Sequence, residues 1–122
     1  MTIRQAIEGI DSIKHNSYTD RQKIAWLSAL DGLIKAELMD THEGGACPFR
    51  GYDDQTDRDT ELLAISPFDQ MYLHHLESKI DYYNAEYERY NNAMAMFQAS
   101  YQDYCSYYHR RHCPKGSAIR YF

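Results

Sequence analysis

Residues 69–112 read DQMYLHHLESKIDYYNAEYERYNNAMAMFQASYQDYCSYYHRRH and carry an unbroken apolar and aromatic repeat. The spacing alternates between three and four residues, which gives the period of about 3.5 residues expected for one apolar face of a helix. Its members are Leu73, Leu76, Ile80, Tyr83, Tyr87, Tyr90, Met94, Phe97, Tyr101, Tyr104 and Tyr108. Because a loop insertion would interrupt so strict a register, the pattern predicts one continuous helix, with Asn91-Asn92 as a tolerable place for a break.

A helix over this stretch would be long for a chain of 122 residues. At ~1.5 Å per residue it would extend roughly 65 Å, whereas a compact domain of this size has a radius of gyration of about 14 Å. We therefore expect the helix to kink, to fold back, or to project into neighbouring copies of the chain.

Two shorter helices are predicted ahead of this stretch, over residues 3–15 and 20–42. Each is preceded by a threonine with a glutamine three residues further on, which is the spacing of a capping box. The pairs are Thr2 with Gln5 and Thr19 with Gln22. Apolar residues then recur every three or four positions in both segments, and the paired glycines Gly44 and Gly45 are typical of a helix end.

Residues 44–66 keep no helical period and predict an extended loop, longer than most connections in compact domains. A Ser-Pro pair at the end of this loop is typical of a helix start, so the long helix is predicted over residues 67–112. A Cys-Pro pair ends it and leaves a basic, extended tail at 114–122. The sequence therefore predicts a single all-α domain, residues 1–122, in which two shorter helices pack on one long C-terminal helix.

Composition and charge favour a protein that works through contact surfaces. Twelve tyrosines contribute to a hydrophobic fraction of 43%, and each keeps a hydroxyl that suits a half-solvated interface. The net charge of −5 argues against a free-standing DNA-binding module, which gains affinity by neutralising phosphates, but it is compatible with a wall past which DNA slides. No apolar run approaches the ~20 residues of a membrane span, so we expect no membrane contact.

The three cysteines, Cys47, Cys105 and Cys113, are an odd number in a chain whose first residues lack the apolar core of a signal peptide. We therefore expect reduced thiols and synthesis in a cytoplasm.

No motif in the sequence predicts a chemistry, so we expect a protein that is not an enzyme and that has no catalytic residue, metal or cofactor. The strongest metal candidate combines Cys105, His109, His112 and Cys113. The spacing is unlike that of common zinc ligands, and the last two residues would point in different directions on a helix. The acidic segment of the loop lacks the glycine and the glutamate that a calcium-binding loop needs at its sixth and twelfth positions.

Two surfaces are predicted to bind partners. The first is a partner-binding loop that joins carboxylates to a short apolar run. Its residues are Asp53, Asp54, Asp57, Asp59, Glu61, Leu62, Leu63 and Ile65. The second is a subunit interface on the second half of the long helix, which the two shorter helices cannot reach. Its residues are Tyr87, Tyr90, Tyr101, Tyr104 and Tyr108. The first half of the repeat is better explained as the core face under the shorter helices.

An ordered set of short motifs covers most of the chain beyond residue 20. The set comprises Trp26-Leu27-Ser28 with Leu30-Asp31-Gly32, Thr41-His42-Glu43-Gly44, Phe49 with Gly51-Tyr52, Asp59-Thr60-Glu61-Leu62-Leu63, Pro67 with Asp69 and Tyr72, Leu76-Glu77, Lys79-Ile80-Asp81-Tyr82, Tyr90-Asn91-Asn92, Phe97, Tyr108, His112 and Pro114. Together these motifs resemble the head-tail connector (neck adaptor) proteins of siphophages that infect Gram-positive bacteria. None of them is a catalytic motif.

The resemblance implies an all-helical subunit of the virion neck that is made in the cytoplasm of the bacterial host. It implies a homo-oligomeric ring below the portal protein, expected to follow twelve-fold symmetry. Such a ring extends the DNA channel, lets DNA pass without specific binding, and receives the tail or a stopper or tail-completion protein. In this setting we expect a tail anchor on a neighbour or on the portal. Its residues are Ile119, Arg120, Tyr121 and Phe122.

The alternative comes from a different class of function. It is a soluble helical interaction or regulatory protein that forms a dimer through the face from Tyr87 to Tyr108. A free dimer should form by itself, whereas a ring adaptor can stay monomeric until a portal templates it.

Overall fold

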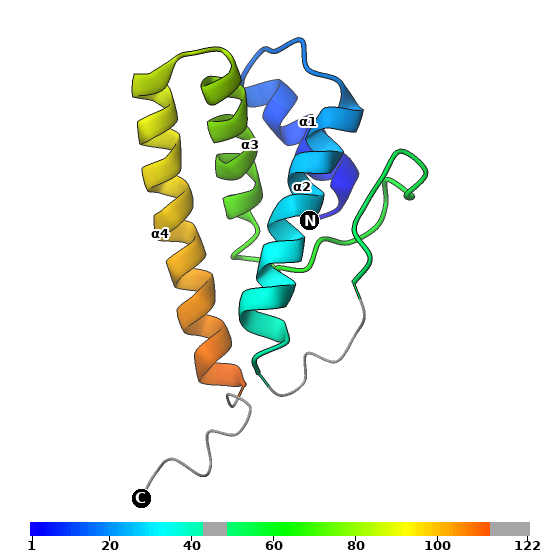
Figure 1. Cartoon of the computed structure of the whole chain (residues 1–122), viewed down its shortest axis with the longest axis vertical. Coiled ribbons are helices and arrows are strands. Elements are labelled where there is room, and N and C mark those ends of the chain that lie inside the picture. Colours follow the sequence, from blue (N-terminus) through cyan, green and yellow to red (C-terminus); the bar gives the residue numbers. More distant parts are fainter. Residues whose placement is uncertain (43–48, 113–122) are drawn as a thin grey trace, which may run out of the picture.

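The chain folds into helices joined by one long loop, and the predicted all-α class is confirmed (Figure 1). The computed structural model describes residues 1–42 and 49–112, and these ranges contain no β-strand element. The elements are α1 (Ile3–Ile13), α2 (Asp20–Ile34), the π-helical turn η1 (Lys35–Met39), α3 (Gln70–Tyr83) and α4 (Tyr87–Arg111). The predicted tail at 114–122 and the first residues of the predicted loop lie outside the described residues.

Both shorter helices begin with the capping boxes that the sequence predicts. At the start of α1 the Thr2 hydroxyl oxygen accepts the Gln5 N–H at 3.1 Å, and the Gln5 side chain accepts the Thr2 N–H at 2.9 Å. Thr19 and Gln22 repeat the arrangement at the start of α2, at 3.2 and 3.0 Å. Each box satisfies two backbone donors that a helix start leaves free. At their other ends both helices stop before the predicted residues 15 and 42.

The second helix continues without a break into the wider turn η1. The Asp40 N–H donates to the Lys35 carbonyl at 2.8 Å, which is the five-residue step of a π-helix. The Thr41 hydroxyl lies 2.8 Å from the Glu37 carbonyl oxygen and 3.0 Å from that of Leu38, so it satisfies the end of the helix. The Leu38 side chain stays in the core.

The prediction of one continuous helix over residues 67–112 is wrong. The helix ends at Tyr83, a second helix begins at Tyr87, and the two run antiparallel, side by side (Figure 1). Asn91 and Asn92, where the sequence would tolerate a break, lie inside α4. Of the three outcomes that the helix length allows, the chain takes the one in which it folds back on itself.

The reversal is made by Asn84, Ala85 and Glu86. Ala85 has φ of 60°, a left-handed conformation in which helices commonly end, although glycine is the usual residue there. The Ala85 N–H donates to the Tyr82 carbonyl at 3.1 Å, and the Glu86 N–H donates to the Asp81 carbonyl at 2.9 Å. Folding back lets much of the apolar repeat be buried within one chain, although its members Tyr83 and Tyr87 next to the turn stay exposed.

The core draws on one face of every helix. α1 and α2 both pack on α3, and α4 packs along the other side of α3. The largest fully buried side chains include Ile3 and Ile10 from α1, Ile24, Leu27 and Ile34 from α2, Met71, Tyr72, Leu76 and Ile80 from α3, and Tyr104 from α4. Burying each such side chain stabilises the fold by roughly 1.5–3 kcal/mol before entropy is counted.

The loop that leads into α3 is fastened to the start of α1. The Arg4 N–H donates to the Arg58 carbonyl at 2.8 Å, and the Leu62 N–H donates to the Met1 carbonyl at 2.9 Å. α3 then begins at Gln70, a little after its predicted start. The loop is therefore held by backbone hydrogen bonds, although its described part, residues 49–69, contains no helix or strand.

Candidate interaction surfaces

A buried carboxylate, Asp31, joins the loop to α2 and α3. Asp31 is fully buried, and its two oxygens accept the Tyr72 hydroxyl at 2.6 Å and the Tyr52 hydroxyl at 2.5 Å. The Leu63 N–H also donates to Asp31, at 3.1 Å, and the Ala64 N–H donates to the Tyr72 oxygen at 2.8 Å. A buried ionised group needs such donors to offset the loss of water. The cluster thus fixes the shape of the loop from within.

The titration of this cluster follows from its burial. Burial raises the pKa of Asp31, while the hydrogen bonds from Tyr52, Tyr72 and Leu63 act in the opposite direction. Burial, together with the neighbouring carboxylate, raises the pKa of both tyrosines above their ordinary value. Both hydroxyls therefore keep their protons and remain donors to Asp31 at neutral pH.

The carboxylates of the predicted partner-binding loop are all exposed, but each already has a role within the chain. Two of them shape turns, because Asp53 accepts the Gln55 N–H at 2.8 Å and Asp57 accepts the Asp59 N–H at 3.0 Å. The other three form ion pairs, Asp59 with Arg4 at 3.0 Å, Glu61 with the Met1 amine at 3.2 Å and Asp54 with Arg21 at 3.5 Å. They lie on the surface, where pairs of this kind are weak.

The apolar residues of the same loop divide between core and surface. Leu62 is only 4% exposed and belongs to the core of its own chain, so its predicted place on a partner-facing surface is wrong. The physical reason is the docking of the loop on α1 and Asp31, which turns this side chain inward. Leu63 is half-buried, and Ile65 is 52% exposed.

The predicted subunit interface divides in the same way. Tyr104 and Tyr108 are 2% and 5% exposed and pack in the core of the same chain, so their assignment to a subunit interface is wrong. They are covered because α4 folds back on α3. Tyr87 is 60% exposed, Tyr90 is half-buried, and half-buried Tyr101 donates its hydroxyl hydrogen to Glu37 at 3.0 Å. For these three tyrosines the interface remains a prediction.

The predicted tail anchor cannot be compared with the structure. Ile119, Arg120, Tyr121 and Phe122 lie outside the described residues.

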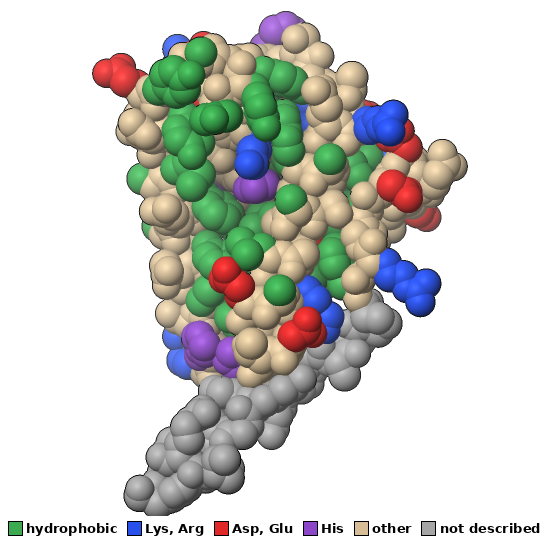
Figure 2. Space-filling view, viewed as in Figure 1, with side chains coloured by type: hydrophobic (Ala, Val, Ile, Leu, Met, Phe, Trp, Pro, Cys, Tyr) green, Lys and Arg blue, Asp and Glu red, His purple; other side chains and the backbone are tan. Residues whose placement is uncertain are grey.

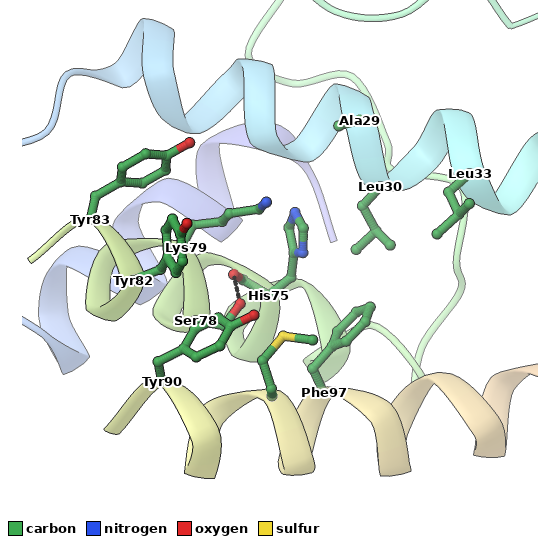
Figure 3. A pocket seen from close by; sticks show the side chains of 11 residues that line it. Ala29, Leu30, Leu33, His75, Ser78, Lys79, Tyr82, Tyr83, Tyr90 and Phe97 are labelled. Atoms are coloured by element: carbon green, nitrogen blue, oxygen red, sulfur yellow. Dashed lines mark hydrogen bonds between the residues drawn. The ribbon is translucent and has the colours of Figure 1, made fainter. Parts of the chain in front are cut away.

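A groove between α2, α3 and α4 is a surface that the sequence did not predict. It has a volume of about 370 Å³ and is mostly apolar (Figure 3). Its lining includes Leu30 and Leu33 from α2, Tyr82 and Tyr83 from α3, and Tyr90, Met94 and Phe97 from α4. Figure 2 shows hydrophobic side chains gathered on this face around a basic side chain and a histidine. The groove exists only because the hairpin sets α4 opposite α2 across α3.

Two polar side chains, His75 and Lys79, stand in the middle of this groove (Figure 3). His75 is 9% exposed, and its Nε2 lies 2.9 Å from the Trp26 carbonyl oxygen, to which it can only donate. Burial lowers the pKa of His75 to about 4, so the ring is neutral at pH 7. Lys79 is half-buried, and it forms no ion pair with any residue of the described ranges.

A strip of aromatic rings in contact with one another continues from the groove toward the hairpin turn. Tyr83 stacks on Trp26 with 5.8 Å between ring centroids, and Tyr82 lies 5.3 Å from Tyr90 and 6.4 Å from Tyr87. Tyr82 and Tyr83 are 50% and 58% exposed, so about half of each side chain is open to solvent. Tyrosine and tryptophan with one covered and one open side are enriched at protein interfaces.

A histidine pair joins α4 to the end of η1. His42 is buried, its Nδ1 lies 2.7 Å from the Leu38 carbonyl oxygen, and its Nε2 lies 2.8 Å from His109 Nδ1. A carbonyl only accepts, so His42 Nδ1 carries a hydrogen and a single hydrogen is shared between the two rings. His109, one of the residues of the metal candidate, is thus engaged with His42. Within the described part of the chain no cluster of three or more potential metal ligands occurs.

The buried carboxylate was within reach of sequence reasoning, whereas the groove was not. Asp31 falls on the apolar face of its helix, four residues after Leu27 and three before Ile34, and a charged residue in that place signals a buried polar contact. No comparable signal in the sequence shows that Lys79 would face α2.

No described helix is both long and apolar enough to cross a lipid bilayer. Comparisons with known proteins find no protein-family model, no curated protein and no solved structure that matches the chain.

Proposed function

We propose that the chain is a structural virion protein, a head-tail connector that forms a ring below the portal of a tailed phage. The ring would extend the DNA channel and join the capsid to the tail or to a stopper protein. The motifs that resemble neck adaptors suggest this role. The exposed aromatic surface on the α3–α4 hairpin is the structural observation that carries it.

This surface supports the proposal because a ring subunit needs contact area that its own fold does not cover. Tyr82, Tyr83 and Tyr87 are each at least 50% exposed and adjoin the apolar groove. Contiguous aromatic surface of this kind marks an interaction site more often than a solvated face. With α4 folded back, the predicted contact area moves from the whole second half of the repeat to this end of the hairpin.

The loop from Asp53 to Ile65 supports the partner-binding part of the proposal. Its backbone is held by Asp31 and by the start of α1, so it presents its carboxylates and Ile65 in one conformation. A preorganised loop loses little further entropy when it binds. The net charge of −5 is also compatible with a channel wall that lets DNA pass without holding it.

The experiment is mass photometry and electron microscopy of the protein alone and mixed with portal-bearing heads of the same phage. Heads without portals are the control for non-specific adsorption. We expect rings of the protein on the portal vertex and no decoration of the control. A stable dimer that ignores portals would overturn the connector proposal and would favour the interaction-protein alternative.

Two variants connect this assay to the predicted contact regions. Deleting residues 117–122 should impair portal decoration while helix content, measured by circular dichroism, stays unchanged. Ile65→Asp should act in the same direction, because it places a charge on an exposed apolar contact of the loop. Ser17→Asp, at an exposed position between α1 and α2 that belongs to none of the predicted contact regions, is a control for the added charge.

A further inference from the structure

The groove contains a cation, Lys79, that forms no ion pair with any described residue, which is an unusual lining for an apolar surface. Lys79 stands among aromatic and aliphatic side chains, and His75, which lines the same groove, is neutral at pH 7. None of the acidic residues in the described part of the chain forms an ion pair with Lys79. An occupant that covered the groove without supplying a carboxylate would leave a buried charge unpaired.

The outer face of α4 offers the complementary feature. Asn92, Met96, Ala99 and Asp103 recur at spacings of four, three and four, so they form one stripe along the helix. All four are exposed, and Met96 is an apolar side chain that is 54% exposed. The residues that pack inward, such as Phe97 and Tyr104, lie on the other side of the helix.

Asp103 completes this stripe with an anion that no residue of the described ranges pairs with. Its carboxylate makes no ion pair or hydrogen bond with another described residue. Glu88, the other carboxylate near the stripe, lies in the first turn of α4, where the helix dipole favours an acidic side chain. Asp103 lies in the middle of the helix and has no such role.

We propose that the groove of one copy of the chain receives the outer face of α4 from a second copy, with Met96 on the apolar lining and Asp103 paired with Lys79. The inference deepens the proposed function, since it names the two surfaces through which neighbours in a ring would meet. Met96 and Asp103 are about 10 Å apart along the helix. Ala99 between them lets the two backbones approach closely.

Charge excludes the two simpler self-contacts. A two-fold contact of groove against groove would bring Lys79 against its own copy, and like charges at an interface are unfavourable. The acidic loop is a poor occupant because its carboxylates are already engaged in turns and ion pairs. Groove and stripe are different surfaces of one chain, so the contact is heterologous and continues from copy to copy until a ring closes.

The test is a charge exchange across the contact. Lys79→Glu and Asp103→Lys should each weaken self-association at least about tenfold, whereas the double variant should recover most of that loss. Self-association is measured by sedimentation velocity on concentrated protein and by counting rings on portal-bearing heads. Glu8→Lys on the exposed side of α1 is the control charge reversal and should change neither readout. Single variants without effect, or a double variant no better than the singles, would overturn the inference.

A second measurement does not depend on charge. A benzophenone amino acid in place of Met96 should cross-link, on irradiation, to peptides of a second copy that contain Leu33, Tyr82 or Tyr83. Cross-links to other surfaces only, or none in either concentrated or portal-bound protein, would overturn the inference. If copies cross-link through the groove but their assemblies do not bind portals, the connector function is overturned and the groove contact stands. If Lys79→Glu leaves the rings on portals unaffected, the connector function stands and the groove contact is overturned.

Discussion

Tyr72 of α3 donates its hydroxyl hydrogen to Asp31 of α2 across 2.6 Å, and its oxygen accepts the Ala64 N–H at 2.8 Å. One hydroxyl thus connects two helices and the loop. The arrangement is fully buried, so each of its polar atoms depends on the others for its hydrogen bonds.

Removing this hydroxyl should destabilise the fold far more than removing an exposed one. Tyr72→Phe leaves the Ala64 N–H unpaired and takes a donor from a buried carboxylate, so we expect the free energy of unfolding to fall by about 3 kcal/mol. Urea denaturation at neutral pH measures this, with Tyr82→Phe as the control at a side chain that is 50% exposed. Equal losses in the two variants would contradict the role given to the cluster.

The ion pair between Lys14 and Asp81 leads to a second prediction. The two side chains meet at 2.6 Å, and that of Asp81 is 1% exposed. The contact that the Lys14 ammonium makes with the accepting Asp81 carboxylate raises the pKa of Lys14, so the amine stays charged at neutral pH. Lys14→Met would leave a buried carboxylate without its cation and should lower the free energy of unfolding by about 3 kcal/mol, measured in urea.

The control for this variant is Arg4→Met. Arg4 pairs with Asp59 at 3.0 Å, but the two side chains are 52% and 69% exposed, and exposed pairs contribute little. Comparable losses from Arg4→Met and Lys14→Met would show that burial does not set the importance of these pairs.

The stability of the protein should depend on pH through His75. The pKa of His75 is about 4 in the fold against an ordinary value of 6.5, because burial disfavours the charged ring. Between these values the unfolded chain binds a proton that the folded chain does not. The contribution of this residue to stability is therefore fully present above pH 6.5 and declines as the pH falls toward 4, by at most roughly 3 kcal/mol.

His75→Gln isolates this effect, since glutamine can still donate to the Trp26 carbonyl but does not titrate. Urea unfolding of both proteins between neutral pH and about pH 5 should show a loss in the parent chain that exceeds the loss in the variant by about 2 kcal/mol. Parallel pH profiles would contradict the assignment, because carboxylates that titrate in this range are common to both proteins.

The turn between α3 and α4 should become more stable with glycine. Ala85 has φ of 60°, where a side chain crowds the backbone, so Ala85→Gly should raise the free energy of unfolding by about 0.5–1 kcal/mol. Ala85→Val should lower it by more than that amount. The same glycine change at Ala99, inside α4, is the opposite control and should destabilise by about 1 kcal/mol. A loss from Ala85→Gly would mean that the turn is not strained.

Local signals in the sequence were sufficient to predict the two shorter helices. The capping boxes at Thr2 and Thr19 correctly predict where α1 and α2 begin, because a cap depends on residues only three positions apart. The apolar faces of the shorter helices are also found in the core. These features do not depend on what the rest of the chain does.

The hairpin escaped prediction because its repeat is compatible with two structures. Tyr83 and Tyr87 are four residues apart, so the apolar register continues across the reversal as if the helix did. No proline or glycine marks the turn, and Ala85 takes a conformation that its type rarely adopts. The groove and the burial of Tyr104 are consequences of the chain reversal between α3 and α4. A sequence analysis that misses the reversal therefore cannot predict either of them.

The hydrogen bond of 2.8 Å between His42 and His109 has a mechanical consequence. It joins His42, the last residue of the first described range, to the last turn of α4, which ends just before residue 112. A pull on the chain after α4 would thus be shared with η1 and α2 instead of peeling α4 from α3 one turn at a time. The histidine pair thus fastens the C-terminal end of α4 to the segment that follows η1, whereas the turn at Ala85 connects the other end of α4 to α3.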